Sequence, residues 1–165
     1  MKFFTSDMHF NHTNVITYCL RNFRTVDEMN EALIKNWNDV VKEDDTVFHL
    51  GDFCFRGEVR PEEWIKKLNG RIVFIKGNHD DRSLSIIRSI EVKFANMKVL
   101  LIHDPDHAPL LSDYHLVLCG HVHRNWKFKI GMGGVPFINV GVDVWNYRPV
   151  KIDEVIDLTN KLKRI

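Results

Sequence analysis

The sequence predicts an α/β domain built on a largely buried sheet or pair of sheets. Six short β-rich segments punctuate the 165 residues, and several are apolar nearly throughout, which is typical of strands covered on both faces. Helical periodicity separates the early strands, whereas the later part of the chain is mostly strand-like. No repeat, low-complexity tract or flexible linker interrupts this pattern, so we expect residues 1–165 to form a single domain.

Local signals define the elements in order along the chain. Thr25 and Glu28 form a capping box that starts the strongest helix, and apolar residues then recur at near-helical spacing. Pro61 suits the first turn of a second helix, and the pair Asn69-Gly70 ends it. The predicted strands are residues 2–6, 46–50, 71–75, 98–102, 116–119 and 136–140. The predicted helices are residues 25–41, 61–68, 82–88 and 153–163.

Composition and charge exclude several classes of protein. Hydrophobic residues make up 44% and charged residues 27%, the balance of an ordinary soluble globule. The formal net charge is +1, so no global field attracts nucleic acid, and such a partner would have to be gripped locally. The sequence has no apolar run long enough to cross a bilayer and no secretory signal pattern, which predicts no membrane partner and a cytoplasmic location. Cys19, Cys54 and Cys119 form no CxxC pair, so we expect buried free thiols.

The informative pattern lies at the ends of the predicted strands. Five of these ends deliver ionisable or amide side chains, and strand-end loops are where α/β folds build their sites. One such segment is weak evidence, because a lone His at a strand end is more often a hydrogen-bonded structural residue. Five in order make independent coincidence implausible. The segments are Asp7-Met8-His9, Gly51-Asp52, Gly77-Asn78-His79-Asp80, His103-Asp104 and Gly120-His121-Val122-His123.

The donor types in these segments indicate which metals they would bind. Carboxylate, imidazole and amide groups without thiolate suit manganese, iron, zinc or nickel, and argue against a structural Cys-zinc site or a calcium cage of oxygens. The candidates are more numerous than one ion needs. Two ions roughly 3.5–4 Å apart, bridged by a carboxylate, would use them all and would clamp phosphorus for in-line displacement.

The ordered series DxH, GD, GNHD, H and GHxH resembles the calcineurin-like metallophosphoesterase superfamily, in particular its small bacterial and phage members. The motifs extend from Asp7 to His123 and so span most of the chain. The resemblance implies a four-layer α/β/β/α sandwich with the metals at the strand ends of one rim. It also implies an active hydrolase, because every ligand position is filled by the expected residue type.

The resemblance further implies individual roles. Two divalent ions, with manganese favoured, would provide a bridging hydroxide as the nucleophile. His79 would be the general acid that protonates the leaving oxygen. The ligand positions divide between the two ions: Asp7, His9 and His123 would hold the first, Asn78, His103 and His121 the second, and Asp52 would bridge them.

The second motif departs from the family pattern at one position. Phe55 stands where the GDxxDRG motif of the phosphoprotein phosphatases has its second Asp, the residue that orients the catalytic His. Asp80 or an unidentified group would have to take that task for His79. Arg56 matches the phosphate-binding Arg of the motif, and its guanidinium fork suits a pair of phosphoryl oxygens; a solvated loop Arg is the alternative.

Two further segments leave their roles open. Asn11 and His12 come directly after the first motif, and they either line the pocket or belong to a plain polar loop. Residues 139–149 are similar to a segment common near the C-terminus of small bacterial and phage members. We expect that segment to pack behind the metal rim.

Four functions fit these motifs, and hydrolysis of a phosphodiester is preferred. A small-molecule or nucleotide ester is the expected substrate, because one clear Arg offers little charge for a dianionic monoester; the protein would be a monomer or homodimer. A phosphomonoesterase or protein phosphatase is the next alternative. A nuclease would need the basic and aromatic residues at 124–129 to bind a nucleic acid strand. Such a pattern is more often found on an ordinary edge β-strand of a sheet. A non-catalytic binding module would be expected to have lost ligand positions, and none is lost.

Overall fold

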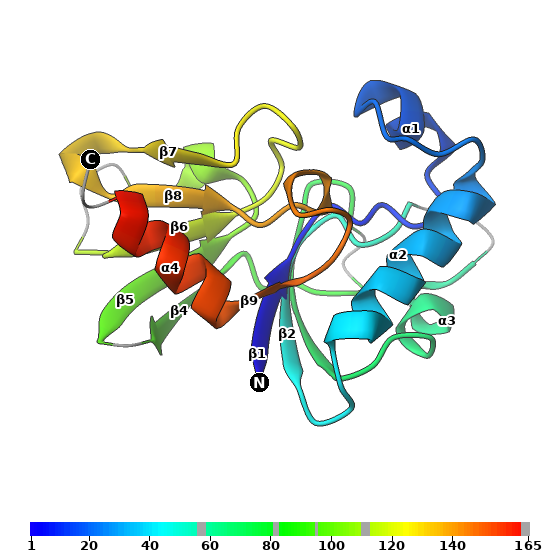
Figure 1. Cartoon of the computed structure of the whole chain (residues 1–165), viewed down its shortest axis with the longest axis horizontal. Coiled ribbons are helices and arrows are strands. Elements are labelled where there is room, and N and C mark those ends of the chain that lie inside the picture. Colours follow the sequence, from blue (N-terminus) through cyan, green and yellow to red (C-terminus); the bar gives the residue numbers. More distant parts are fainter. Residues whose placement is uncertain (56–58, 81–82, 95, 110–112, 163–165) are drawn as a thin grey trace.

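The apolar strands assemble into two sheets that helices flank (Figure 1). The computed structural model describes residues 1–55, 59–80, 83–94, 96–109 and 113–162. The first sheet has the order β3-β2-β1-β9, in which β1, β2 and β3 are parallel and β9 is antiparallel to β1. Its strands are β1 (Lys2–Thr5), β2 (Thr46–Leu50), β3 (Arg71–Ile75) and β9 (Val150–Lys151).

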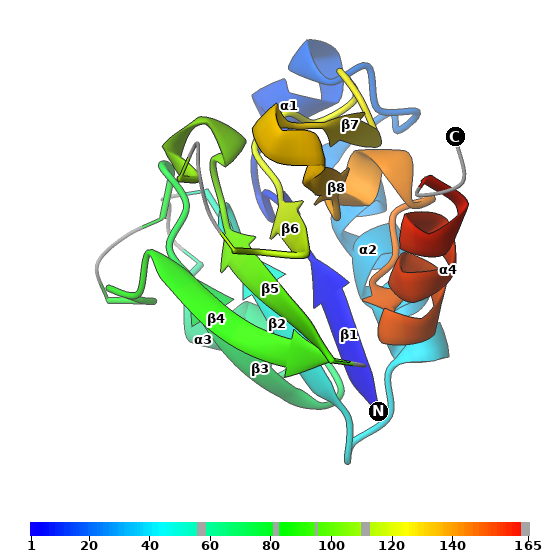
Figure 2. The same ribbon diagram turned by 90° about the vertical axis from the view of Figure 1, so that its left-hand side faces the viewer.

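The second sheet has the order β4-β5-β6-β8-β7. Its central strands β5, β6 and β8 are parallel, whereas the edge strands β4 and β7 are antiparallel to their neighbours. In Figure 2 the strands β4, β5 and β6 lie in front of β1, β2 and β3. The strands are β4 (Ser89–Phe94), β5 (Met97–Ile102), β6 (Leu116–Cys119), β7 (Phe128–Ile130) and β8 (Pro136–Asn139).

Alternation along the strands divides the core into layers. Phe4 of β1 and Leu50 of β2 belong to the apolar cluster that the two sheets share, whereas the neighbouring Phe3 belongs to the cluster under α2. Successive side chains of a strand point to opposite faces, so an apolar strand can fill both layers at once.

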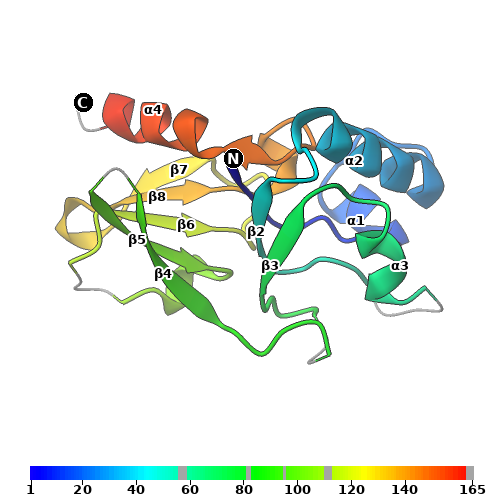
Figure 3. The same ribbon diagram turned by 90° about the horizontal axis from the view of Figure 1, so that it is seen from below.

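Helices cover this framework on more than one side. The hydroxyl of Thr25 accepts a hydrogen bond from the backbone N–H of Glu28 at 3.1 Å and so starts α2, which packs Trp37 against the first sheet. Val155 of α4 joins the cluster between the sheets, and α4 and α2 run along the top of Figure 3. The helices are α1 (Thr13–Tyr18), α2 (Val26–Val40), α3 (Pro61–Ile65) and α4 (Ile152–Leu162), with short 3-10 turns η1 (Pro105–His107), η2 (Met132–Gly134) and η3 (Val142–Val144).

The predicted α/β sandwich of two sheets flanked by helices is confirmed, and all six predicted strands are present to within a residue at each end. The helix predicted at residues 82–88 is wrong over the described residues 83–88, which form a turn and irregular backbone. The Ser85 hydroxyl accepts a hydrogen bond from the Ile87 N–H and donates one to the Phe74 carbonyl, a local alternative to helical bonding. In the described part of the chain, none of the helices is long and apolar enough to span a membrane.

Candidate metal centre

The loops after five parallel strands meet at one rim of the two sheets. The Asp7 N–H donates to the Gly51 carbonyl and the His9 N–H to the Asp52 carbonyl, each at 3.0 Å, which ties together the loops after β1 and β2. Five predicted site residues have positive φ angles between 46° and 68°, a conformation that costs a non-glycine residue about 1 kcal/mol or more. They are Asp7, His9, Asp52, His121 and His123.

Two motif glycines permit the close approach of these loops. A Cβ at Gly77 would lie 2.1 Å from Oδ1 of Asp52, and one at Gly120 would lie 1.8 Å from Oγ of Ser6. Both contacts are far below van der Waals distance, and neither glycine has a positive φ. The two motifs therefore need glycine here for space, because neighbouring loops pack directly against their backbones.

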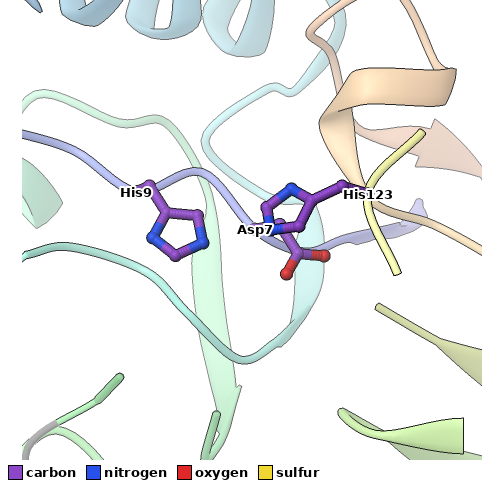
Figure 4. Close-up of side chains that lie close together, drawn as sticks. All are labelled: Asp7, His9 and His123. Atoms are coloured by element: carbon purple, nitrogen blue, oxygen red, sulfur yellow. The ribbon is translucent and has the colours of Figure 1, made fainter. Parts of the chain in front are cut away.

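One group of side chains contains Asp7, His9 and His123, whose potential ligand atoms lie within 4.8 Å of one another (Figure 4). The Asp7 carboxylate accepts a hydrogen bond from the Ser6 hydroxyl at 2.6 Å and one from the His121 N–H at 3.0 Å. His9 Nε2 is buried and has no hydrogen-bond partner among the described residues. His123 donates through Nδ1 to Asp143 at 2.8 Å, which leaves Nε2 available for an ion.

A second group contains Asn78, His103 and His121. Asn78 Oδ1 lies 2.9 Å from His103 Nε2 and 3.0 Å from His121 Nδ1. His103 donates through Nδ1 to the Leu50 carbonyl at 2.7 Å, so its Nε2 faces the group. Asp52 Oδ2 lies 3.4 Å from His103 Nε2 and 3.6 Å from His9 Nε2, between the two groups. The structure thus brings together all seven predicted ligand residues, with Asp52 at the position expected of a bridge.

The pKa values of these side chains reflect burial opposed by opposite charge. Burial raises the pKa of Asp7 and lowers that of His9 well below its usual value. Burial would also raise the pKa of Asp52, but the hydrogen bond and charge of His103 outweigh it and hold that pKa well below the usual range. Burial is likewise outweighed at two histidines: the Asp52 hydrogen bond raises the pKa of His103 to about 9, and the Asp143 hydrogen bond raises that of His123 to about 10.

These residues fit divalent first-row ions. The unpartnered, buried Nε2 of a neutral His9 offers a lone pair, and the buried Asp7 and Asp52 carboxylates offer negative charge that a cation would complement. Cys19, His123 and Asp143 also lie within ligand distance of one another. That trio does not fit a cation, because the guanidinium of Arg21 already lies 2.8 Å from Asp143.

The structure also places the predicted general acid at the centre. The His79 N–H donates to Oδ1 of Asp52 at 2.9 Å, and the His79 ring lies 5.4 Å from the ring of His9 between centroids. Both carboxylate oxygens of Asp80 accept hydrogen bonds from the backbone N–H groups of Asp52, Phe53 and Gly77, so Asp80 braces two loops rather than orienting the His79 ring. Arg56, the predicted phosphate clamp, lies outside the described residues.

A cavity of about 740 Å³ opens beside the two groups. His12 lines it together with His79, so His12 belongs to the pocket rather than to a plain polar loop. Its ring stacks on Phe55 with 4.3 Å between centroids, and its Nδ1 lies 3.3 Å from Nδ1 of His9. Three exposed apolar side chains also line the cavity: Tyr18, Leu20 and Phe55.

Three further residues support the centre, and sequence reasoning gave none of them an individual role, although Asn139 and Asp143 lie in the segment 139–149 that was expected to pack behind the metal rim. Arg21 and Asp143 form a buried ion pair next to His123. The Asn139 amide donates to the carbonyls of His123 and Trp126 at 2.7 and 2.9 Å, which holds the loop after β6. Asn139 ends a strand and could have been found by the same strand-end argument. For Arg21 no such signal exists, because its partner is 122 residues away.

Comparison with known proteins places this geometry in a family. The chain is 42% identical to an uncharacterized protein of Methanocaldococcus jannaschii over 96% of this chain and 90% of that protein. It is 30% identical to the Gene 66 protein of Mycobacterium phage L5 over 96% of this chain and 94% of that protein. The crystal structure of a protein of unknown function from Aquifex aeolicus superposes with a TM-score of 0.75 at 25% identity, covering 96% of this chain and 98% of the other. Residues 2–151 match the model of the calcineurin-like phosphoesterase superfamily domain, and the chain belongs to that family.

Proposed function

We propose that this protein is a phosphodiesterase that hydrolyses its substrate with two divalent metal ions. The observation that carries the proposal is the position of Asp52, whose Oδ2 lies within 3.6 Å of a nitrogen from each group of candidate ligands. When bound, two ions would supply Lewis acidity at phosphorus and an activated water nucleophile. Asp7, His9 and His123 would hold one ion, Asn78, His103 and His121 the other, and Asp52 both.

The chain's own residues would position the substrate and move one proton. His79 is held at the centre by its backbone bond to Asp52, while its ring lines the cavity. It would donate a proton to the leaving oxygen as the ester bond breaks. His12 and Phe55, stacked on each other at the side of the cavity, would contact the organic part of the ester.

The lining of the cavity favours a diester over a monoester. Among the described lining residues Arg124 is the only Lys or Arg, and its guanidinium donates to the Leu20 carbonyl at 2.8 Å. The described part of the lining therefore offers a dianionic monoester little permanent positive charge apart from the metal ions. A diester carries one negative charge and a second organic group, which the exposed apolar surface of Tyr18 and Leu20 can contact.

The basic residues that a nuclease would use to grip a nucleic acid strand have partners within the protein. Lys127 Nζ lies 3.5 Å from the centroid of the Trp145 ring, and Lys129 Nζ lies 4.9 Å from that of Trp126. We therefore prefer a small diester to a nucleic acid as the substrate.

Comparing two substrates and one variant tests the proposal. With Mn²⁺, the favoured ion, bis-p-nitrophenyl phosphate should be hydrolysed faster than p-nitrophenyl phosphate. His79→Ala should lower kcat by about 10²–10⁴-fold for a diester with a poor alkoxide leaving group, and by less for p-nitrophenoxide, which needs no proton. His115→Ala, at an exposed histidine just before β6 and so at the end of that strand opposite His121, is the matched control. A monoester preference would contradict the diester assignment, and an equal loss for both leaving groups would contradict the role of His79.

The state of the cysteines bears on the cellular compartment of the enzyme. Cys19, Cys54 and Cys119 are buried free thiols, as expected, and support a reducing compartment such as the cytoplasm. We also propose that residues 1–165 act as a single domain, as a monomer or a homodimer.

A further inference from the structure

A buried ion pair lies behind the group formed by Asp7, His9 and His123. Arg21 comes after α1 in the chain, and Asp143 lies in η3 near the C-terminus. The guanidinium donates through Nε to Asp143 Oδ1 at 2.8 Å and through Nη2 to Oδ2 at 3.1 Å. Both side chains have 0% exposed surface, so neither charge is screened by water.

The same guanidinium also holds the backbone that carries two candidate ligands. Its Nη2 donates to the Asp7 carbonyl at 2.6 Å, and its Nη1 donates to the Met8 carbonyl at 2.9 Å. Asp7 and His9 flank these bonds, and both have positive φ angles. A planar fork with several donors suits this task, because it can hold a carboxylate and two carbonyls in one fixed arrangement.

Asp143 connects the pair to the third candidate ligand. Its Oδ2 accepts a hydrogen bond from Nδ1 of His123 at 2.8 Å. That bond assigns the proton to Nδ1 and turns Nε2 towards Asp7 and His9, the arrangement in which a carboxylate orients a metal-bound imidazole. The ion pair therefore contacts Asp7 at its backbone and His123 at its side chain, and it also bonds the backbone of Met8, the residue between Asp7 and His9.

We propose that Arg21 and Asp143 are positioning residues that set the affinity of the first metal site, an inference that rests on the proposed two-metal function. A buried ion pair contributes little net stability, because desolvation offsets most of its attraction. The contribution of the pair here is its fixed geometry, which holds the candidate ligands in place. In the second group His103 donates to the Leu50 carbonyl, and Asn78 contacts His103 and His121. The hydrogen bonds of Arg21 and Asp143 go to none of these three residues, so we expect the pair to act on the first site.

A neutral double variant tests the proposal without leaving a buried charge unpaired. Arg21→Gln with Asp143→Asn keeps polar groups of similar size and removes both charges. The native apoprotein should bind two Mn²⁺ ions in calorimetric titration and give the exchange-coupled EPR spectrum of a dinuclear centre. The double variant should bind one ion with native affinity and the other about 10- to 100-fold more weakly. When enough Mn²⁺ has been added to fill only the tight site of the double variant, its EPR spectrum should be that of an isolated Mn²⁺ ion.

The chain offers a matched control in a second Arg–carboxylate fork. Arg148 donates to Glu154 at 2.7 and 3.1 Å and has no contact with the candidate ligands. Arg148→Gln with Glu154→Gln should leave both affinities unchanged. If the first double variant does not fold, Arg21→Lys keeps the charge pair but cannot reach both carbonyls, and it should weaken one site in the same way.

The outcomes separate this inference from the proposed function. Native-like binding of two ions by the Arg21 and Asp143 variants would overturn the inference alone. Equal weakening in the Arg148 and Glu154 control would also overturn it, because the effect would then not be specific to the first site. A native protein that binds no Mn²⁺ would overturn the proposed function and the inference with it.

Discussion

Several polar side chains in or near the centre are almost fully buried, and Asp7, His9 and His49 are among those with at most 2% of their surface exposed. Burial of a polar group costs free energy unless a partner compensates for it. An ion would compensate for burial at Asp7 and His9. His49, inside β2, packs against the rings of Phe53 and Phe74, and neither of its ring nitrogens has a hydrogen-bond partner in the described part of the chain.

His49 should make the protein sensitive to acid. Burial lowers its pKa to about 3, so it stays neutral in the folded protein while the unfolded chain takes up a proton below about pH 6.5. Its contribution to stability is thus present above pH 6.5 and is lost as the pH falls towards 3. We expect His49→Phe to lose less stability than the native protein between pH 7 and pH 4.5, by on the order of 2 kcal/mol.

Urea unfolding of the metal-free proteins at both pH values measures this difference. His107→Gln, at an exposed histidine, should behave like the native protein at both pH values. Parallel loss of stability in the His49→Phe and native proteins would show that another group controls the acid response.

At the scale of the elements, Asp80 joins the loops after β2 and β3. Its Oδ2 accepts from the N–H groups of Asp52 and Gly77, each at 2.8 Å, and its Oδ1 accepts from that of Phe53 at 2.9 Å. Asp80→Ala would leave three donors without an acceptor, each worth about 1–3 kcal/mol. We expect the free energy of unfolding to fall by several kcal/mol, and by less in Asp80→Asn, which keeps one oxygen. Urea unfolding would contradict this role if Asp80→Ala lost less stability than Asp80→Asn.

The start of α2 depends on the capping bond of Thr25. Its hydroxyl accepts from the Glu28 N–H at 3.1 Å, and the Glu28 carboxylate accepts from the Arg24 N–H at 2.8 Å. Thr25→Ala should lower the free energy of unfolding by about 1 kcal/mol, measured by urea titration. Thr13→Ala, at the exposed first residue of α1, should have little effect, and an equal loss in both variants would argue against a specific cap.

The elements that sequence analysis identified are those whose signal is local. The strands β3, β5 and β6 are apolar nearly throughout, and α2 has both a cap and a periodic apolar face. Strand β4 was missed, although its residues alternate between exposed and buried as an edge strand should, because its sequence Ser-Ile-Glu-Val-Lys-Phe contains no long apolar run. The turn at Ser85 resembles a helix in sequence because its hydroxyl bonds are not visible in a pattern of hydrophobicity.

The ligands of the candidate site could be predicted because their signal is also local, whereas the residues that support them could not. Each ligand motif lies within a few residues of a strand end, so the motif and its element can be recognised together. The support behind the ligands arises from contacts between distant segments. Arg21 and Asp143 are 122 residues apart, and although Asp143 lies in the segment expected to pack behind the metal rim, nothing in the sequence pairs it with Arg21.

At the scale of the whole molecule, the centre joins the two sheets. Asp7 and His9 come after β1 of the first sheet, whereas His123 comes after β6 of the second, and Asp52 and His103 likewise come from different sheets. An ion held by either group would therefore link the sheets directly. Because the unfolded chain does not bring these residues together, ion binding should stabilise the folded state of the entire protein.

Metal removal should consequently lower the thermal stability of the protein as a unit. An ion at 100 times its dissociation constant adds about 2.7 kcal/mol, which for a chain of this size corresponds to a Tm increase of about 5–10 °C. Scanning calorimetry of EDTA-treated protein, before and after addition of Mn²⁺, should show one transition that shifts by this amount. The shift should be much smaller in Asp52→Asn, which weakens a ligand shared by both groups, and unchanged in Asp39→Asn, whose exposed partner is Lys35. A native transition that does not respond to Mn²⁺ would mean that the two groups do not bind ions across the sheets.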